Sequence, residues 1–157
     1  MKYFTQKLLN NDSTKSDYEW EVVCQKYYNS LKNLIDVKIS KDFFEFYKSN
    51  DAFHDFVILN IEYTNSKADI DSTNKLILTT FHNGKNYNIV YNKVDKFEYG
   101  IKYTDNLKYV AMRKNGIDVI LYDEILDQNN LMLSHELLLV SGGIMKVYCS
   151  EIYIKTQ

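Results

Sequence analysis

The sequence predicts an α+β fold in one domain that spans residues 1–157, with helices first and an antiparallel β-sheet after them. Two observations lead to this prediction. Near residue 53 the spacing of apolar residues changes from the helical period to the alternation of strands. Beyond that point, three glycine-containing pairs separate the alternating runs as hairpin turns do: Asn83-Gly84, Asn115-Gly116 and Gly142-Gly143. No strand–helix–strand crossover is recognisable, so the strands are expected to form a mostly antiparallel meander.

The first helix is expected over about residues 16–37. Ser16 or Asp17 is a suitable N-cap, because either side chain can accept a hydrogen bond from the first turn. From Trp20 to Ile35, apolar residues recur three, four and seven positions apart, which forms one apolar stripe along a helix.

A second, shorter helix is expected over about residues 41–50, capped by Ser40 or Asp42. Its four aromatic residues within five positions cover most of the helix circumference, so this helix should pack on two sides. These residues are Phe43, Phe44, Phe46 and Tyr47.

The turn residues also predict the registers of three hairpins. Asparagine and glycine adopt the positive φ that a two-residue hairpin turn requires. Closure at the three turns pairs Leu78 with Ile89, Leu76 with Tyr91, Met112 with Val119, Arg113 with Asp118, Val140 with Met145, and Leu138 with Val147. Each register collects apolar side chains on one face, as a correct register should.

The composition excludes several classes of function. The net charge is −2, with 19 basic and 21 acidic residues, and no region has the basic excess that tracks a nucleic-acid backbone. No apolar run approaches the length of a signal peptide or a membrane span. Cys24 and Cys149 lack the neighbours of a redox or metal motif and are expected to be reduced thiols. We therefore expect a cytoplasmic protein with no cofactor, no metal, no nucleic acid and no membrane partner.

His54-Asp55 is the first candidate polar cluster. The pair resembles the dyad of metal phosphohydrolases, but such sites need further ligands, and only two other histidines are present. The alternative is that His54 or Asp55 caps the second helix or binds turn backbone.

His135 is the second candidate. Strand alternation places it on an apolar face, where a histidine is usually a hydrogen-bonded core residue. Tyr122 and Glu124 lie on the preceding strand, so the three side chains could form a buried polar network or an acid–base pair. The motifs of serine hydrolases, nucleotide-binding loops and zinc proteases are missing.

Several sequence blocks resemble a family of small, uncharacterised bacterial proteins. The blocks are Met1-Lys2-Tyr3-Phe4-Thr5, His54-Asp55, Leu121-Tyr122-Asp123-Glu124-Ile125 and the run from Ser134 to Gly143. The resemblance implies helices followed by a curved antiparallel sheet. Proteins of this kind are sometimes found beside bacterial toxin genes, so it also implies an immunity-type role. The family has no established catalytic residues, and none can be transferred to this chain.

The leading hypothesis is a non-enzymatic module that binds another protein, with a toxin as the partner that the resemblance implies. Tyr122, Asp123 and Glu124 are the expected contact residues, because acidic and aromatic side chains suit a basic partner. One alternative is an enzyme or small-ligand-binding protein that uses His135, Glu124 and Tyr122, or His54 and Asp55. The other is a structural homo-oligomer that pairs exposed sheet edges; the oligomeric state stays open.

Overall fold

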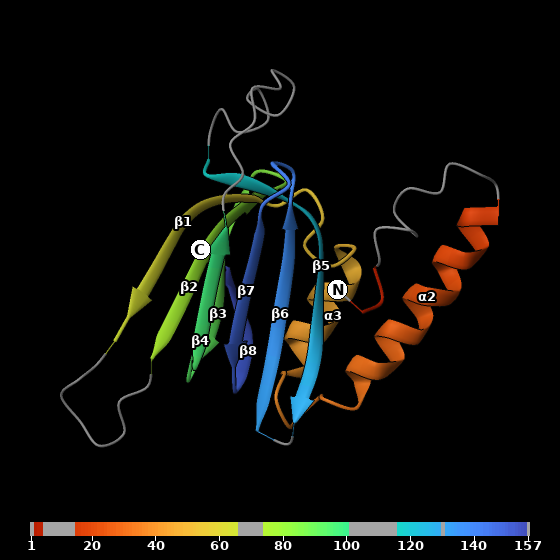
Figure 1. Cartoon of the computed structure of the whole chain (residues 1–157), viewed down its shortest axis with the longest axis horizontal. Coiled ribbons are helices and arrows are strands. Elements are labelled where there is room, and N and C mark those ends of the chain that lie inside the picture. The colour runs from red at the N-terminus through yellow and green to blue at the C-terminus, as the bar shows by residue number, and fades with distance from the viewer. Residues whose placement is uncertain (1, 5–14, 66–73, 101–115, 130, 157) are drawn as a thin grey trace.

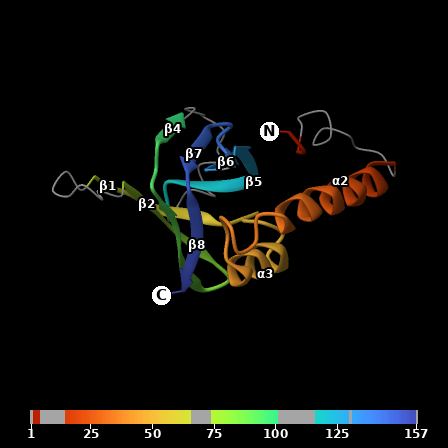
Figure 2. The same cartoon turned by 90° about the horizontal axis from the view of Figure 1, so that it is seen from below.

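A computed structural model describes residues 2–4, 15–65, 74–100, 116–129 and 131–156 of the chain. It has the predicted α+β architecture, with two N-terminal helices and a strongly curved antiparallel sheet (Figure 1). Helix α2 (Lys15–Lys32) extends away from the sheet at its N-terminal end, whereas α3 (Lys41–Ser49) lies close against it (Figure 2). Neither helix combines the length and apolar character that a membrane span requires.

The second helix begins as predicted. Ser40 is its N-cap, and the Ser40 hydroxyl accepts a hydrogen bond from the Phe43 N–H at 3.1 Å. Phe43, Phe44 and Tyr47 are buried, and Phe46 is partly buried, so this helix does pack on two sides.

The first helix ends earlier than predicted, at Lys32 instead of residue 37. Asp36 adopts a left-handed φ of 64°, and the N–H groups of Lys38 and Ile39 both turn back to the Leu34 carbonyl. This compact turn carries Ile39 to the sheet, where it forms a bridge with Ile152. The helical spacing of apolar residues in the sequence continues to Leu34 because Leu34 is buried, although the helix itself has already ended at Lys32.

Eight strands form the sheet, in the order β4-β7-β6-β5-β1-β2-β3-β8. Strands β1-β2-β3 and β5-β6-β7 are two sequential meanders, while the other neighbours are not consecutive in the chain. The strand bounds are β1 Val57–Thr64, β2 Lys75–His82, β3 Lys85–Asn92, β4 Lys96–Gly100, β5 Asp118–Asn129, β6 Met132–Leu139, β7 Ile144–Cys149 and β8 Glu151–Thr156.

The hairpin at Asn83-Gly84 is confirmed in type and register. The two turn residues have φ of 48° and 78°, as a type I′ turn requires. Across this turn Leu78 pairs with Ile89, and Leu76 pairs with Tyr91.

The register predicted at Gly142-Gly143 is wrong. Met145 pairs with Leu137 instead of Val140, because the loop spans residues 140–143 and not two glycines alone. The Leu139 N–H donates to the Gly143 carbonyl, whereas the Val140 N–H donates to the Val119 carbonyl of β5. Val140 is therefore bonded to β5 and is not paired with β7 in the hairpin.

The first strand of the hairpin predicted at Asn115-Gly116, residues 109–113, lies outside the described residues. The described half does not fit the prediction. Val119 pairs with Val57 of β1 on one side, and its carbonyl accepts the Val140 N–H on the other. Both sides of Val119 are therefore occupied by segments other than the predicted Met112.

The curvature of the sheet brings β3 and β6 face to face across a common core. Strand β5 pairs with β1 at two residue positions only, so the sheet consists of two four-stranded halves that are joined by this short contact. The Tyr91 hydroxyl of β3 reaches the His135 ring of β6 across the core at 2.8 Å. Large aromatic side chains fill the space, among them Tyr27, Tyr47, Phe43, Phe53 and Phe56.

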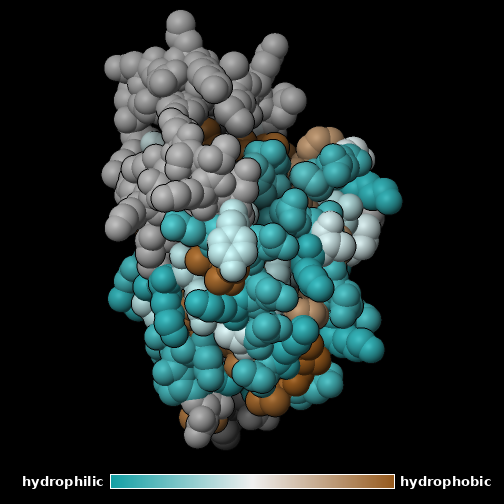
Figure 3. Space-filling model, turned by 90° about the vertical axis from the view of Figure 1, so that its right-hand side faces the viewer, coloured by the Kyte–Doolittle hydropathy of each residue, from teal (hydrophilic) through white to brown (hydrophobic). Residues whose placement is uncertain are grey.

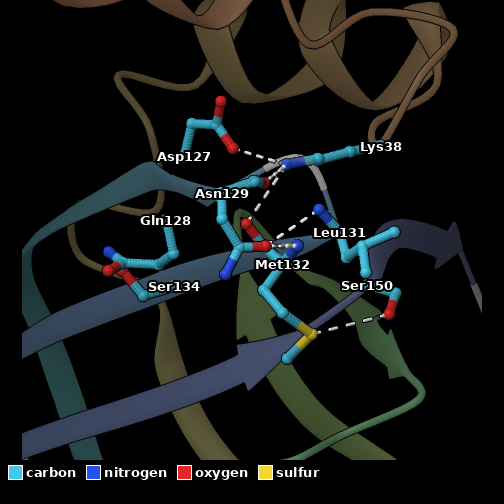
Figure 4. Close-up of polar contacts among 8 residues, drawn as sticks. All are labelled: Lys38, Asp127, Gln128, Asn129, Leu131, Met132, Ser134 and Ser150. Carbon is cyan, nitrogen blue, oxygen red and sulfur yellow. Dashed lines mark hydrogen bonds and ion pairs between the residues drawn. The ribbon is translucent and has the colours of Figure 1, made fainter.

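A buried lysine attaches the connection between the helices to the end of the β5–β6 hairpin. The Lys38 ammonium donates to the Asp127 carboxylate and to the carbonyls of Asn129 and Met132, the last at 3.2 Å (Figure 4). With its side chain 5% exposed, Lys38 is compensated by one charge and two backbone acceptors.

Candidate functional site

A surface pocket of about 380 Å³ lies between residues 2–4, helix α2, the turn that follows α3, and strand β5. Five of its lining residues are aromatic or histidine side chains from different parts of the chain. The lining residues are Phe4, Trp20, Cys24, Tyr28, Asp51, Ala52, His54, Tyr122 and Asp123.

Helix α2 supplies one wall of the pocket. Along this helix face, each lining residue follows the previous one by four positions, so their side chains lie one above the other: Trp20, Cys24 and Tyr28. All three are partly buried. The Trp20 ring meets the Tyr122 ring edge-on, with centroids 5.6 Å apart, and this contact closes the wall against β5.

The turn after α3 supplies the opposite wall, and its backbone is strained. Asp51, Ala52 and Asp55 have positive φ of 47°, 63° and 63°. Alanine rarely adopts this conformation, which surrounding contacts must therefore enforce. The Ala52 N–H donates to the Tyr47 carbonyl, and the Asp55 N–H donates to the Ile120 carbonyl.

Asp123 fixes this turn from inside the protein. Its Oδ1 accepts the Phe53 N–H at 2.9 Å, and its Oδ2 accepts the Tyr47 hydroxyl at 2.7 Å. The same Oδ2 lies 2.7 Å from His135 Nε2. A carboxylate that is 2% exposed thus has three polar partners, which compensates its burial.

His135 is enclosed, with 1% of its surface exposed. Its Nε2 faces the carboxylate of Asp123, which only accepts hydrogen bonds, so Nε2 carries a proton. Its Nδ1 faces the Tyr91 hydroxyl, and burial raises the Tyr91 pKa well above its ordinary value. Tyr91 therefore keeps its proton, which its hydroxyl can donate to Nδ1.

The network continues from Asp123 to helix α2. The Tyr47 and Tyr27 hydroxyls lie 2.9 Å apart, and the Tyr27 hydroxyl accepts the Ile125 N–H at 2.7 Å. Burial, with the Asp123 charge as the next cause, raises the pKa of both tyrosines well above the ordinary value. Helix α2 is thus held along the edge of β5 opposite β6, beyond the two positions at which β1 pairs with β5.

Glu124 holds the N-terminal wall in place. Successive residues of a strand point to opposite faces, so Glu124 points away from Asp123 and the core network. Its carboxylate accepts the backbone N–H groups of Lys2, Tyr3 and Phe4, the second at 2.8 Å. Phe4 is thereby placed against Trp20, with ring centroids 5.2 Å apart.

Asp51 contributes an exposed carboxylate to the pocket. Its side chain makes no hydrogen bond or ion pair with any other described residue. Burial raises the pKa of the Cys24 thiol, and the Asp51 carboxylate raises it further. Burial likewise raises the pKa of Tyr28, with smaller contributions from Cys24, Asp123 and Asp51, in that order. Both groups are therefore neutral at physiological pH, so Cys24 is not an activated thiolate.

The predicted pair His54-Asp55 lies in the turn beside the pocket, and only His54 lines it. His54 lines it, and its Nδ1 lies 3.2 Å from the Asp55 carboxylate, at a largely exposed position. The His54 ring also contacts Tyr122, with centroids 5.4 Å apart. Asp55 itself does not line the pocket.

The predicted contact surface of Tyr122, Asp123 and Glu124 needs correction. Asp123 and Glu124 are 2% and 0% exposed, because each carboxylate binds inward-facing polar groups, so they form no acidic surface. Tyr122 is partly exposed and lines the pocket. The expected grouping of His135 with Glu124 is also wrong: the carboxylate on the His135 face of β5 is Asp123.

Sequence reasoning did not find Trp20, Cys24, Tyr28 and Asp51 as site residues. Trp20 and Cys24 were assigned to a core stripe and Tyr28 was not singled out, although the spacing of four along the helix was an available signal. Nothing near Asp51 in the sequence indicates its left-handed backbone, since that conformation depends on contacts with Asp123 and β5.

The described residues contain no group of three or more histidine, cysteine or acidic side chains arranged to hold a metal ion. No protein-family model and no curated protein matches this chain. The family resemblance of the sequence blocks therefore stays a prediction.

Proposed function

We propose that this chain is a non-enzymatic protein-binding module of the cytoplasm, and that it holds its partner at the aromatic pocket. An immunity protein that neutralises a toxin by direct binding is the specific form of this function that the sequence resemblance implies.

The composition of the pocket carries the proposal. Trp20, Tyr28 and Tyr122 are partly exposed, rigid and amphipathic, and tryptophan and tyrosine dominate the residues that contribute most to binding at protein interfaces. Over the described residues, the side of the molecule drawn in Figure 3 is mostly hydrophilic, with apolar side chains in separate patches. A hollow with aromatic walls inside a polar rim is the usual anatomy of an interface centre.

The state of the titratable groups favours binding over acid–base chemistry. His135 and Asp123 are enclosed and engaged with each other and with two tyrosine hydroxyls. A general acid or base must reach the substrate within hydrogen-bond distance. His135 does not line the pocket, and Asp123, which does, is 2% exposed and already has three polar partners. The neutral Cys24 thiol likewise gives no support to a nucleophilic mechanism.

Binding of a small ligand in the same pocket is the second candidate, because about 380 Å³ lies within the range of small-molecule sites. Homo-oligomerisation through sheet edges has less support. The edge strands β4 and β8 are short and carry charged residues that discourage pairing, namely Lys96, Glu98, Glu151 and Lys155.

The test compares the wild-type chain with Trp20→Ala and with Tyr18→Ala as a matched control. Tyr18 is an aromatic residue of the same helix that is 73% exposed and does not line the pocket. Partners captured from the encoding organism are identified, purified and titrated against each variant. We expect a 1:1 complex that Trp20→Ala weakens about 30-fold, the effect of an interface hot spot, while Tyr18→Ala leaves it unchanged.

Two results would contradict the proposal. One is that no purified protein binds the wild-type chain. The other is that Trp20→Ala and Tyr18→Ala have equal effects on the complex. Protection of cells from the partner's toxicity then tests the immunity form of the proposal separately.

A further inference from the structure

The walls of the pocket suit a positive charge. Phe4, Trp20 and Tyr122 meet one another tilted or edge-on, at 42° and 63°, so these lining rings do not stack on each other. Aromatic faces that are not stacked on another ring carry partial negative charge and attract a cation that lies against them. No lysine or arginine of the described chain lines the pocket to occupy that position.

Asp51 adds a full negative charge at the rim. Its carboxylate is uncompensated within the described residues, whereas the neighbouring carboxylate of Asp55 already pairs with His54. The left-handed backbone of Asp51 and Ala52 keeps this carboxylate beside the aromatic walls at a cost in strain. Its field also acts on Cys24 and Tyr28, two side chains of the opposite wall.

A second hollow of about 290 Å³ shares Cys24 and Tyr28 with the pocket, and Glu21, Lys32 and Lys48 are its charged lining residues. Its two lysines outnumber its one carboxylate, whereas the described lining of the aromatic pocket holds carboxylates and no lysine or arginine. A cationic group is therefore favoured in the aromatic pocket over the second hollow.

We propose that the pocket receives an arginine side chain of the partner, with its guanidinium against the aromatic wall and beside the Asp51 carboxylate. This inference rests on the proposed protein-binding function and specifies its chemistry. Arginine fits better than lysine, because a planar guanidinium stacks on aromatic rings while it donates two parallel hydrogen bonds to one carboxylate.

The test uses two blocked tripeptides that differ in charge but hardly in shape. Acetyl-Ala-Arg-Ala-amide carries the guanidinium, and the citrulline analogue replaces it with a neutral urea. Trp20 is the only tryptophan of the chain, so its fluorescence reports on the pocket directly. We expect the arginine peptide to bind the wild-type chain about tenfold more tightly than the citrulline peptide.

Asp51→Asn tests the carboxylate, and Asp55→Asn is the matched control. Both residues lie in the same turn at positive φ, which asparagine also adopts, so both variants should keep the fold. Circular dichroism and thermal unfolding check this directly. Asp51→Asn should bring the arginine peptide to within about twofold of the citrulline peptide, and Asp55→Asn should leave the difference intact.

The inference is overturned if the arginine peptide does not bind, if both peptides bind equally, or if Asp55→Asn acts as strongly as Asp51→Asn. Its failure differs from failure of the proposed function. If Trp20→Ala abolishes binding of the partner protein but the two peptides bind equally, the protein-binding function is supported and the proposed arginine recognition is refuted. Selective binding of the arginine peptide without any protein partner upholds cation recognition and refutes the protein-binding function.

Discussion

Alkaline pH is expected to unfold this chain, because three of its 14 tyrosines are enclosed in the polar network around Asp123. Tyr27, Tyr47 and Tyr91 have a pKa well above the ordinary value. Burial is the main cause for each, since a phenolate is poorly solvated in the core, and the Asp123 charge adds to it.

The sign and the size of the effect follow from proton linkage. Above about pH 10 a tyrosine of the unfolded chain loses its proton, whereas the buried ones keep theirs, so the free energy of unfolding falls as pH rises. Each buried tyrosine contributes about 1.4 kcal/mol per pH unit, and the three contribute about 4 kcal/mol. Burial also raises the pKa of Cys149 to about 12, which adds a loss that begins near the thiol's ordinary pKa. For an ordinary domain stability of about 10 kcal/mol, unfolding should occur between about pH 11 and 12.

The assay follows tyrosinate absorbance and far-ultraviolet circular dichroism through one pH titration. The exposed tyrosines should ionise first in the folded protein, and the last fraction should appear together with the loss of circular dichroism. Tyr91→Phe should lower the dependence of unfolding free energy on pH by about 1.4 kcal/mol per unit. Ionisation of every tyrosine in one step near its ordinary pKa, with the fold intact, would refute this account of the network.

Three further predictions concern stability in urea at neutral pH, followed by Trp20 fluorescence. Asp123→Ala should lower the free energy of unfolding by about 4 kcal/mol, because it removes the acceptor of the Phe53 N–H and of two side chains. Asp123→Asn should lower it by less, because the amide keeps one acceptor oxygen. Equal losses for the two variants would contradict this prediction. Gly116→Ala should cost about 3 kcal/mol, because the added Cβ would lie 2.5 Å from a Val57 methyl and 2.6 Å from the Ile58 carbonyl oxygen. A Cβ at Gly84 would meet no atom within 4 Å, so Gly84→Ala should cost about 1 kcal/mol from its positive φ alone. Lys38→Met should cost about 2 kcal/mol by leaving two buried carbonyls unpaired, and an unchanged stability would show that water replaces the ammonium.

Local signals in the sequence were sufficient for the features that depend on a few neighbouring residues. The Asn83-Gly84 hairpin was predictable because asparagine and glycine set the backbone of the turn, which then fixes the register of the strands. The Ser40 cap was predictable because the bond from Phe43 spans three residues. Neither feature needs a contact with a distant part of the chain.

Features that depend on distant contacts were not predictable in this way. The Gly142-Gly143 register changes because Val140 binds the backbone of Val119, a residue in another hairpin. The role of Glu124 depends on three N–H groups that lie 120 to 122 positions earlier in the chain. An acidic residue next to a tyrosine in the sequence has the same local signature whether it is exposed or enclosed.

The run Tyr122–Glu124 shows how a site can be chosen correctly and interpreted wrongly. Its three side chains do not form a surface together, because neighbouring residues of a strand point to opposite faces. Instead Tyr122 lines the pocket, Asp123 holds the turn that carries Asp51, and Glu124 holds the segment that carries Phe4. Two buried carboxylates on one strand therefore position two separate walls of the same pocket. Substitution of either should weaken the binding proposed above without touching the ligand, and the loss should be accompanied by reduced stability, which distinguishes it from the loss caused by Asp51→Asn.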